Sequence, residues 1–212
     1  MSRYSLEEEE QINKLKAFWA SYGNFILTVL IIVFGTFAAN NGYKWYQARQ
    51  SNQSVLAYEK TERASQEGNI ELLKKVQGTL LNEHSGSPYA QRGAVLAAQA
   101  FYDAGEIEEA KTSLNWVIEH GDLNEYVSSA RLTLSGLLID EEKYEEATAL
   151  LKDKAGEGFE GLFLDRQGDI MALSGKPDQA RSLYEASLEK LQSDSPWRSV
   201  VERKIAALPA GK

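Results

Sequence analysis

Cysteine is absent from the 212-residue sequence, and proline and histidine are scarce, with four and two residues. Without cysteine there is no disulfide framework, no thiolate nucleophile and no thiolate zinc site. Basic residues are outnumbered, 23 against 31 acidic ones, and the net charge of -8 would repel a phosphate backbone. No dense basic patch offsets this charge, so the sequence predicts no nucleic-acid partner.

The remaining composition is that of a folded protein. Hydrophobic residues make up 43% of the chain and charged residues 25%, which is too apolar for a disordered protein. The first 50 residues are nearly neutral, and the acidic excess lies in the rest of the chain. We therefore expect the two parts to lie in different surroundings.

A run of 27 uncharged residues separates Lys16 from Lys44. A helix of about 20 apolar residues spans the hydrocarbon core of a bilayer. Aromatic residues, which favour the headgroup layers, stand at both ends of the run: Trp19, Tyr22, Tyr43, Trp45 and Tyr46. The pattern predicts one transmembrane helix over residues 22–43, between an N-terminal tail of residues 1–21 and a juxtamembrane linker of residues 44–52.

Two other interpretations of this run are open. A cleaved signal peptide would use the small residues around Phe37, but the long start with four consecutive glutamates differs from the short basic start of such peptides. A buried core helix would need a larger domain around it than the remaining chain provides. Basic residues flank both ends of the run, so the positive-inside rule does not decide the orientation.

Beyond residue 52 the sequence is rich in helix-forming residues and shows no strand pattern, so the predicted fold class is all-α. Pro88, Pro177 and Pro196 stand where helices are expected to begin, and Pro209 follows the last one. Because no proline interrupts an apolar period, the helices are expected to be regular.

Three windows of this part superpose: residues 94–117, 131–154 and 164–187. A small residue of the second helix recurs at Ala110, Ala147 and Ala180, and the spacings of 37 and 33 residues are near the roughly 34 of a tetratricopeptide repeat. The windows resemble such repeats. They lack the tryptophan of the fourth place and the proline of the last place, so the copies are degenerate.

Further helices are expected on both sides of the windows. Residues 53–66 and 69–81 predict a helix pair without the small-residue pattern, and residues 197–208 predict an amphipathic helix that caps the stack. We therefore expect an α-solenoid of degenerate tetratricopeptide-like helix pairs over residues 53–212. A non-repeating helical bundle is the alternative, and glycines at matched places count against it.

Catalytic motifs find little support in the sequence. Residues 156–161 spell G-x-G-x-x-G, but a predicted helix precedes these glycines where a dinucleotide-binding fold has a strand. His84 and His120 stand alone near predicted helix ends, without the paired ligands of a metal site. We expect no enzyme activity, no metal and no cofactor. A catalytic triad assembled from distant residues is the arrangement that the sequence leaves open.

In the repeats that the windows resemble, the second, fifth, ninth and twelfth places of the first helix face a groove. These places are Arg92, Val95, Gln99 and Tyr102 in the first copy, Ser129, Leu132, Gly136 and Ile139 in the second, and Leu162, Asp165, Asp169 and Ala172 in the third. The groove is expected to be apolar at its centre and acidic at one end, which suits an extended or incompletely folded polypeptide, with Tyr102 and Ile139 as anchors.

The predicted partner-binding residues are Arg92, Val95, Gln99, Tyr102, Leu132, Ile139, Asp165 and Asp169. For Val95, Leu132 and Ile139, packing against a neighbouring helix is the alternative.

The order of features along the whole chain resembles the YfgM-like ancillary subunits of the SecYEG translocon. The resemblance rests on the start Tyr4 to Gln11, on Lys14, Lys16 and Trp19 before the anchor, on Tyr43 to Tyr46 after it, and on Gly168 to Ala172. It implies a non-catalytic accessory protein in the bacterial inner membrane, with a cytosolic N-terminus and periplasmic repeats.

The resemblance also implies partners. These are the SecYEG translocon, a PpiD-like membrane-anchored isomerase, periplasmic client polypeptides that are passed to chaperones, and a cytosolic stress-response regulator. A membrane-anchored tetratricopeptide scaffold for cell-envelope assembly is the alternative function. Such scaffolds usually carry a lipoprotein cysteine or a cleaved signal, and this chain has no cysteine.

Overall fold

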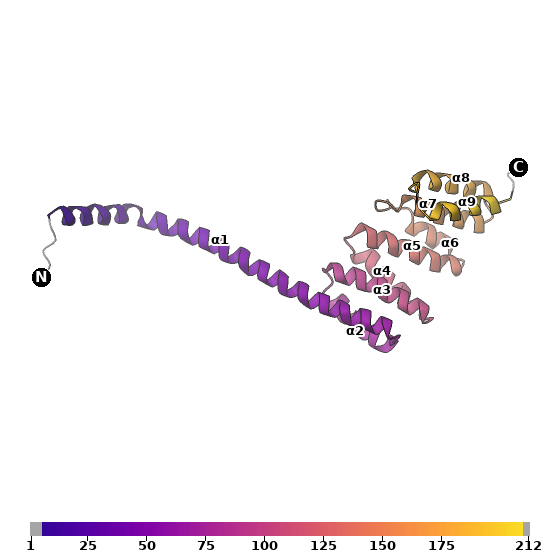
Figure 1. Cartoon of the computed structure of the whole chain (residues 1–212), viewed down its shortest axis with the longest axis horizontal. Helices are drawn as coiled ribbons and strands as arrows, with labels where there is room; N and C mark the ends of the chain where they lie inside the picture. Colours follow the sequence, from indigo (N-terminus) through magenta and orange to yellow (C-terminus); the bar gives the residue numbers. More distant parts are fainter. Residues whose placement is uncertain (1–5, 210–212) are drawn as a thin grey trace. The chain divides into compact units, whose positions relative to one another are not determined.

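The computed structural model describes residues 6–209, with side chains for residues 9–45 and 52–209. Within that range the chain forms nine α-helices and no strand, so the predicted all-α class is confirmed (Figure 1). The helices are α1 (Leu6–Gln66), α2 (Ile70–Glu83), α3 (Pro88–Asp103), α4 (Ile107–His120), α5 (Asn124–Asp140), α6 (Tyr144–Leu150), α7 (Glu160–Leu173), α8 (Pro177–Lys190) and α9 (Trp197–Ala207).

Two units make up the chain, Met1–Asn52 and Gln53–Lys212, and α1 continues through the boundary between them. Among the residues that carry the family resemblance, Tyr4 and Ser5 lie outside the described residues. The side chains of residues 6–8 and 46–51 also lie outside them.

The first unit contains the apolar part of α1. The segment Glu9–Trp45 is long and apolar enough to cross a membrane, and only 6% of its most apolar stretch is buried. A core helix would be covered by other elements, so this exposure does not support the core-helix interpretation. The hydroxyls of Thr28 and Thr36 donate to the carbonyls of Asn24 and Ile32 at 2.8 and 2.7 Å, which satisfies these polar groups without water.

Four helix pairs make up most of the second unit, and each pair closes with the same turn. The turn residues have a left-handed backbone, with φ of 64°, 80°, 60° and 73°: Gly68, Gly105, Glu142 and Gly175. In each turn this residue's N–H donates to the carbonyl three residues earlier, and the next N–H donates to the carbonyl five residues earlier. The end of α1 and α2 therefore form a repeat of the same kind as the three predicted windows.

The interior of each pair is built on two recurring buried places. The first helices carry small residues at one of them, namely Thr61, Ala98, Ser135 and Gly168. The second helices carry Leu73, Ala110, Ala147 and Ala180 at the other, all with no exposed surface. Because Leu73 replaces the alanine of the later copies, the small-residue pattern alone does not identify the first repeat.

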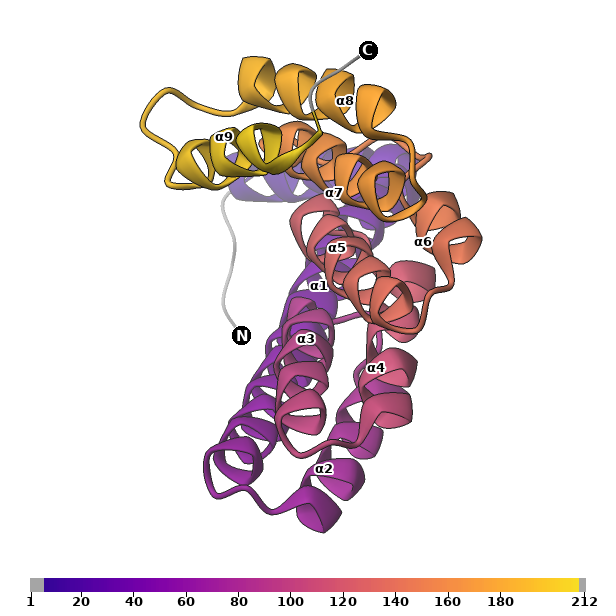
Figure 2. The same cartoon turned by 90° about the vertical axis from the view of Figure 1, so that its right-hand side faces the viewer.

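Successive pairs stack, so that α3 contacts α5 and α5 contacts α7. Figure 2 shows α3 and α5 in one layer and α4 and α6 in the other. The main core lies between these layers and includes Phe101, Leu114 and Ile170. At the C-terminal end α9 packs on α8 and buries Val201 against Ala180 and Tyr184, as expected of a capping helix.

Replacement of Gly168 by alanine tests this packing. A Cβ at this position would lie 2.5 Å from ring carbons of Tyr184, so Gly168→Ala should lower the free energy of unfolding of residues 53–212 by about 1–3 kcal/mol. Urea unfolding followed by circular dichroism measures the change.

Gly78→Ala in α2 is the matched control, because a Cβ there meets nothing within 4 Å. This variant should gain about 0.5–1 kcal/mol from the better helix propensity of alanine. Equal effects of the two substitutions would contradict the packing of α7 against α8.

Candidate functional site

Two hollows lie between the first helices of successive repeats. The first has a volume of about 330 Å³ and lies between the end of α1 and α3. The second, of about 250 Å³, lies between α3 and α5 and is closed on one side by Arg166 of α7. Equivalent places of the repeats line both hollows: Leu96, Gln99, Ala100 and Asp103 in the first, and Thr133, Gly136, Leu137 and Asp140 in the second. We call the two hollows together the first-helix groove.

Three residues of α3 and four of α5 line the second hollow, together with residues of α4 and α7. Tyr102 lines it with 46% of its surface exposed, and Gln99 lines both hollows. The amide Nε2 of Gln99 donates to the carboxylate of Asp103 at 2.8 Å, which orients the amide along α3. The groove therefore presents a phenol ring and an amide beside each other.

The side chain of Arg166 adds a positive charge to the lining of the second hollow. A Cβ at Gly136 would lie 3.2 Å from a guanidinium nitrogen of Arg166, so glycine at this position makes room for the arginine. Among the described residues no carboxylate lies within ion-pair distance of this guanidinium. Such a group binds carboxylates in a planar, two-point geometry.

The predicted site residues fall into three groups. The first group, Gln99 and Tyr102, lies in the first-helix groove. Arg92 makes a different contact, because its guanidinium carbon lies 5.0 Å from the centre of the Tyr58 ring. The apolar members Val95, Leu132 and Ile139 are half-buried and pack against the main core, as the packing alternative describes. The further predicted groove places Ser129, Leu162 and Ala172 are also half-buried.

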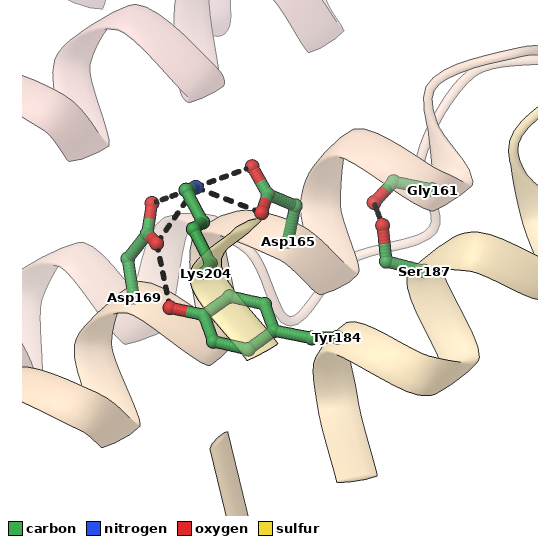
Figure 3. Close-up of polar contacts among 6 residues, drawn as sticks. All are labelled: Gly161, Asp165, Asp169, Tyr184, Ser187 and Lys204. Carbon is green, nitrogen blue, oxygen red and sulfur yellow. Dashed lines mark hydrogen bonds and ion pairs between the residues drawn. The ribbon is translucent and has the colours of Figure 1, made fainter. Parts of the chain in front are cut away.

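The third group is Asp165 and Asp169, which bind a lysine of the capping helix (Figure 3). Nζ of Lys204 donates to both carboxylate oxygens of Asp165 at 2.8 Å and to Asp169 at 2.9 Å. The hydroxyl of Tyr184 donates to Asp169 at 2.8 Å, and the Lys204 nitrogen lies 5.6 Å from the centre of the same ring. The acidic end of the predicted groove is therefore used within the fold.

Burial controls the ionisation of this cluster. It raises the pKa of the Asp165 carboxyl above its ordinary value, although Lys204 acts in the opposite direction. Burial and the Asp169 carboxylate together raise the pKa of the Tyr184 phenol, which keeps its proton as the donor to Asp169. One cation thus balances two carboxylates in a partly buried site.

Arg166 and Lys204 are the two important residues that the repeat pattern does not identify. Arg166 occupies the sixth place of its helix, outside the predicted groove places, and it is the one basic residue of α7. Lys204 lies on the capping helix, whose contacts depend on how the end of the stack is closed. The single basic residue in α7 is the sequence signal for Arg166, whereas no local signal identifies Lys204.

The residues that suggest catalysis lie in a loop and at helix ends. The glycines of residues 156–161 lie mostly between α6 and α7, and the amide of Gly156 donates to the Ser128 hydroxyl at 2.8 Å. His120 ends α4 and stacks on Trp116, with ring centres 5.0 Å apart, while His84 follows the last turn of α2. Over the part of the chain that the structure describes, no group of acidic or histidine side chains is arranged to hold a metal ion.

Removal of the lysine cation tests the cluster. Lys204→Met should lower the free energy of unfolding of residues 53–212 by about 3 kcal/mol at pH 7, because two partly buried carboxylates lose their partner. The folded-state pKa of Asp165 lies above its ordinary value, so the folded form binds the proton more tightly. Without Lys204 the pKa of Asp165 should rise further, so the folded variant binds the proton at a higher pH than the native protein does, and its loss of stability should shrink as the pH falls below 7.

Urea unfolding at several pH values measures this effect. Lys154→Met, at an exposed position between α6 and α7, is the control and should change stability little at any pH. A pH-independent loss in the Lys204 variant would show that packing, rather than charge, explains its effect.

The comparisons with known proteins agree with this architecture. The family model described as a tetratricopeptide repeat-like domain matches residues 16–210. A protein of Neisseria gonorrhoeae named ancillary SecYEG translocon subunit is 28% identical over 96% of this chain and 98% of its own length. Proteins of the same name from Haemophilus influenzae and Escherichia coli are 25% and 21% identical, each over 86% of this chain and over 89% and 87% of their own lengths. The chain therefore belongs to the tetratricopeptide repeat-like family, and its resemblance to the YfgM-like members of that family is confirmed.

Proposed function

We propose that this chain is a membrane-anchored, non-catalytic ancillary subunit of the SecYEG translocon. The observation that carries the proposal is the match over nearly the full length of a protein with that name, which includes both the apolar helix and the repeats. A likeness limited to the repeats would indicate only a fold, because tetratricopeptide stacks serve many functions.

The proposed domain organisation follows the sequence prediction. Residues 1–21 form the N-terminal tail, residues 22–43 the transmembrane helix, residues 44–52 the juxtamembrane linker and residues 53–212 the repeat domain. The division of the chain after Asn52 supports the start of the repeat domain. We place the tail in the cytosol and the repeats in the periplasm, because a short tail and a long acidic domain suit that orientation.

In the proposed mechanism the anchor holds the repeat domain beside the translocon exit. This raises its effective concentration near emerging polypeptides without any input of energy. The first-helix groove binds extended segments: Tyr102 packs on apolar side chains, Gln99 pairs with the peptide backbone, and Arg166 binds carboxylates. Release to periplasmic chaperones then needs no chemical step.

The proposed partners follow from the same arrangement. The repeats receive periplasmic client polypeptides and contact a PpiD-like membrane-anchored isomerase. The cytosolic tail binds a stress-response regulator.

Co-purification from membranes in mild detergent tests the proposal. We expect quantitative mass spectrometry to find translocon subunits with the full chain, and far less of them with a chain whose residues 1–52 are replaced by a cleavable export signal. Retention of the isomerase by the truncated chain would assign that contact to the repeats. Recovery of cell-wall or outer-membrane assembly factors in place of translocon subunits would favour the envelope-scaffold alternative.

Substitutions in the first-helix groove test the client-binding role. Tyr102→Ala and Arg166→Ala should each weaken binding of a permanently unfolded polypeptide, such as a reduced and carboxymethylated protein, by about 5–30-fold, the effect of losing one interface anchor. Fluorescence anisotropy with the purified repeat domain measures the affinity. Trp197→Ala on α9, where 48% of the side chain is exposed, is the control with similar exposure outside the groove. An equal loss of affinity in the Trp197→Ala control would contradict the proposal that the first-helix groove is the binding surface.

A further inference from the structure

A third hollow lies at the N-terminal end of the helix stack, away from the first-helix groove. It has a volume of about 420 Å³ and lies on the first helix pair, between the end of α1 and α2. The residues that matter for its chemistry are Leu56, Ala57, Lys60, Lys75, Val76 and His84. We call the surface formed by these six residues the end face.

The repeat itself shows that the place of Leu56 is normally covered. Counted back from the shared turn, its equivalents in the next three pairs are Gly93, Ala130 and Phe163, and all three are buried. At Gly93 the covering atoms are known, because a Cβ there would collide with the side chain of Leu80 in the preceding pair. Leu56, in contrast, is 57% exposed. The end face is thus the surface on which a preceding helix pair would stack.

Charge on the end face differs from that of the chain as a whole. The equivalents of Lys60 in the next two pairs are Ala97 and Leu134, both buried. Lys60 and Lys75 are exposed, and neither has an ion-pair partner among the described residues. Glu83 is the one carboxylate that lines the hollow. The end face therefore carries positive charge on a chain whose net charge is -8.

An unsatisfied polar atom lies at the edge of the same hollow. Nδ1 of His84 is buried and has no hydrogen-bond partner among the described residues. Buried polar atoms nearly always have a hydrogen-bond partner, so an unpaired ring nitrogen at this position is unusual.

We propose that the end face docks an amphipathic helix of a different protein, which continues the stack. Its apolar stripe covers Leu56 and Val76, and its carboxylates pair with Lys60 and Lys75. A helix is the occupant because helices cover the equivalent places in the other pairs. A second copy of this chain fits poorly, because a twofold contact would oppose the two lysines with their own copies and leave Glu83 alone to offset them. This docking is separate from whatever the first-helix groove binds.

Site-specific photo-crosslinking in cells that produce the full chain tests the inference. Leu56 is replaced by benzoylphenylalanine, and Leu173, which is 58% exposed at the end of α7, carries the same probe in the control chain. The Leu56 probe should crosslink to a segment of another protein that has an apolar stripe flanked by Asp or Glu, and mass spectrometry of the crosslinked peptide identifies that segment. The Leu173 probe should not give this product.

Charge reversal separates specific docking from chance contact. Lys60→Glu with Lys75→Glu should reduce the crosslink about tenfold, whereas Lys60→Arg with Lys75→Arg should retain it. Crosslinking to a second copy of this chain, to lipid, or to nothing above the control would overturn the proposal. An unchanged yield after charge reversal would also overturn it. Translocon co-purification, measured on the same cells, reports on the proposed function separately.

Discussion

The fold of the second unit depends on contact between neighbouring helix pairs. One pair cannot bury both of its apolar faces, so each pair requires the next one along the chain. The contacts between the first and second pairs show how this is achieved: a Cβ at Gly93 would collide with Leu80, and the Gln77 amide donates to the Ser113 hydroxyl at 2.7 Å. At each end of the stack the last pair has one face without a neighbouring pair, so that face needs another cover.

The C-terminal end is closed by a helix and a charge cluster acting together. Val201 of α9 covers the last pair, and Lys204 of the same helix binds Asp165 and Asp169 on α7. Burial alone would favour a protonated Asp165, and the lysine offsets that cost only when α9 is in place. The apolar contact packs α9 on α8, while the ion pairs join α9 to α7. The end face, at the N-terminal end of the stack, has neither a capping helix nor an ion-pair cluster among the described residues.

Much of this architecture follows from the sequence, and the exceptions have physical reasons. The apolar run, the repeat windows and the capping helix are local patterns, so the sequence predicts them. It does not predict that one helix, α1, runs from Leu6 to Gln66 through the apolar run and the residues after it. The small-residue pattern does not identify the first repeat, because Leu73 stands where the later copies have alanine. The glycine pattern does not identify the turn at Glu142, because a glutamate has the left-handed backbone there. The pairing of Lys204 with Asp165 is a contact between distant segments, which no local period encodes.

The groove is suited to weak and tolerant binding. Its two hollows lie at equivalent places of successive repeats, and Gln99 lines both, so an extended segment can meet two hollows along its length. Half-burial of Val95, Leu132 and Ile139 in the core leaves few deep apolar anchors, which limits the affinity of any one contact. The proposed function does not require high affinity, because an anchor that holds the repeat domain beside emerging polypeptides raises the effective concentration. Weak binding also allows release without nucleotide hydrolysis, because only the small binding free energy of a few contacts must be overcome.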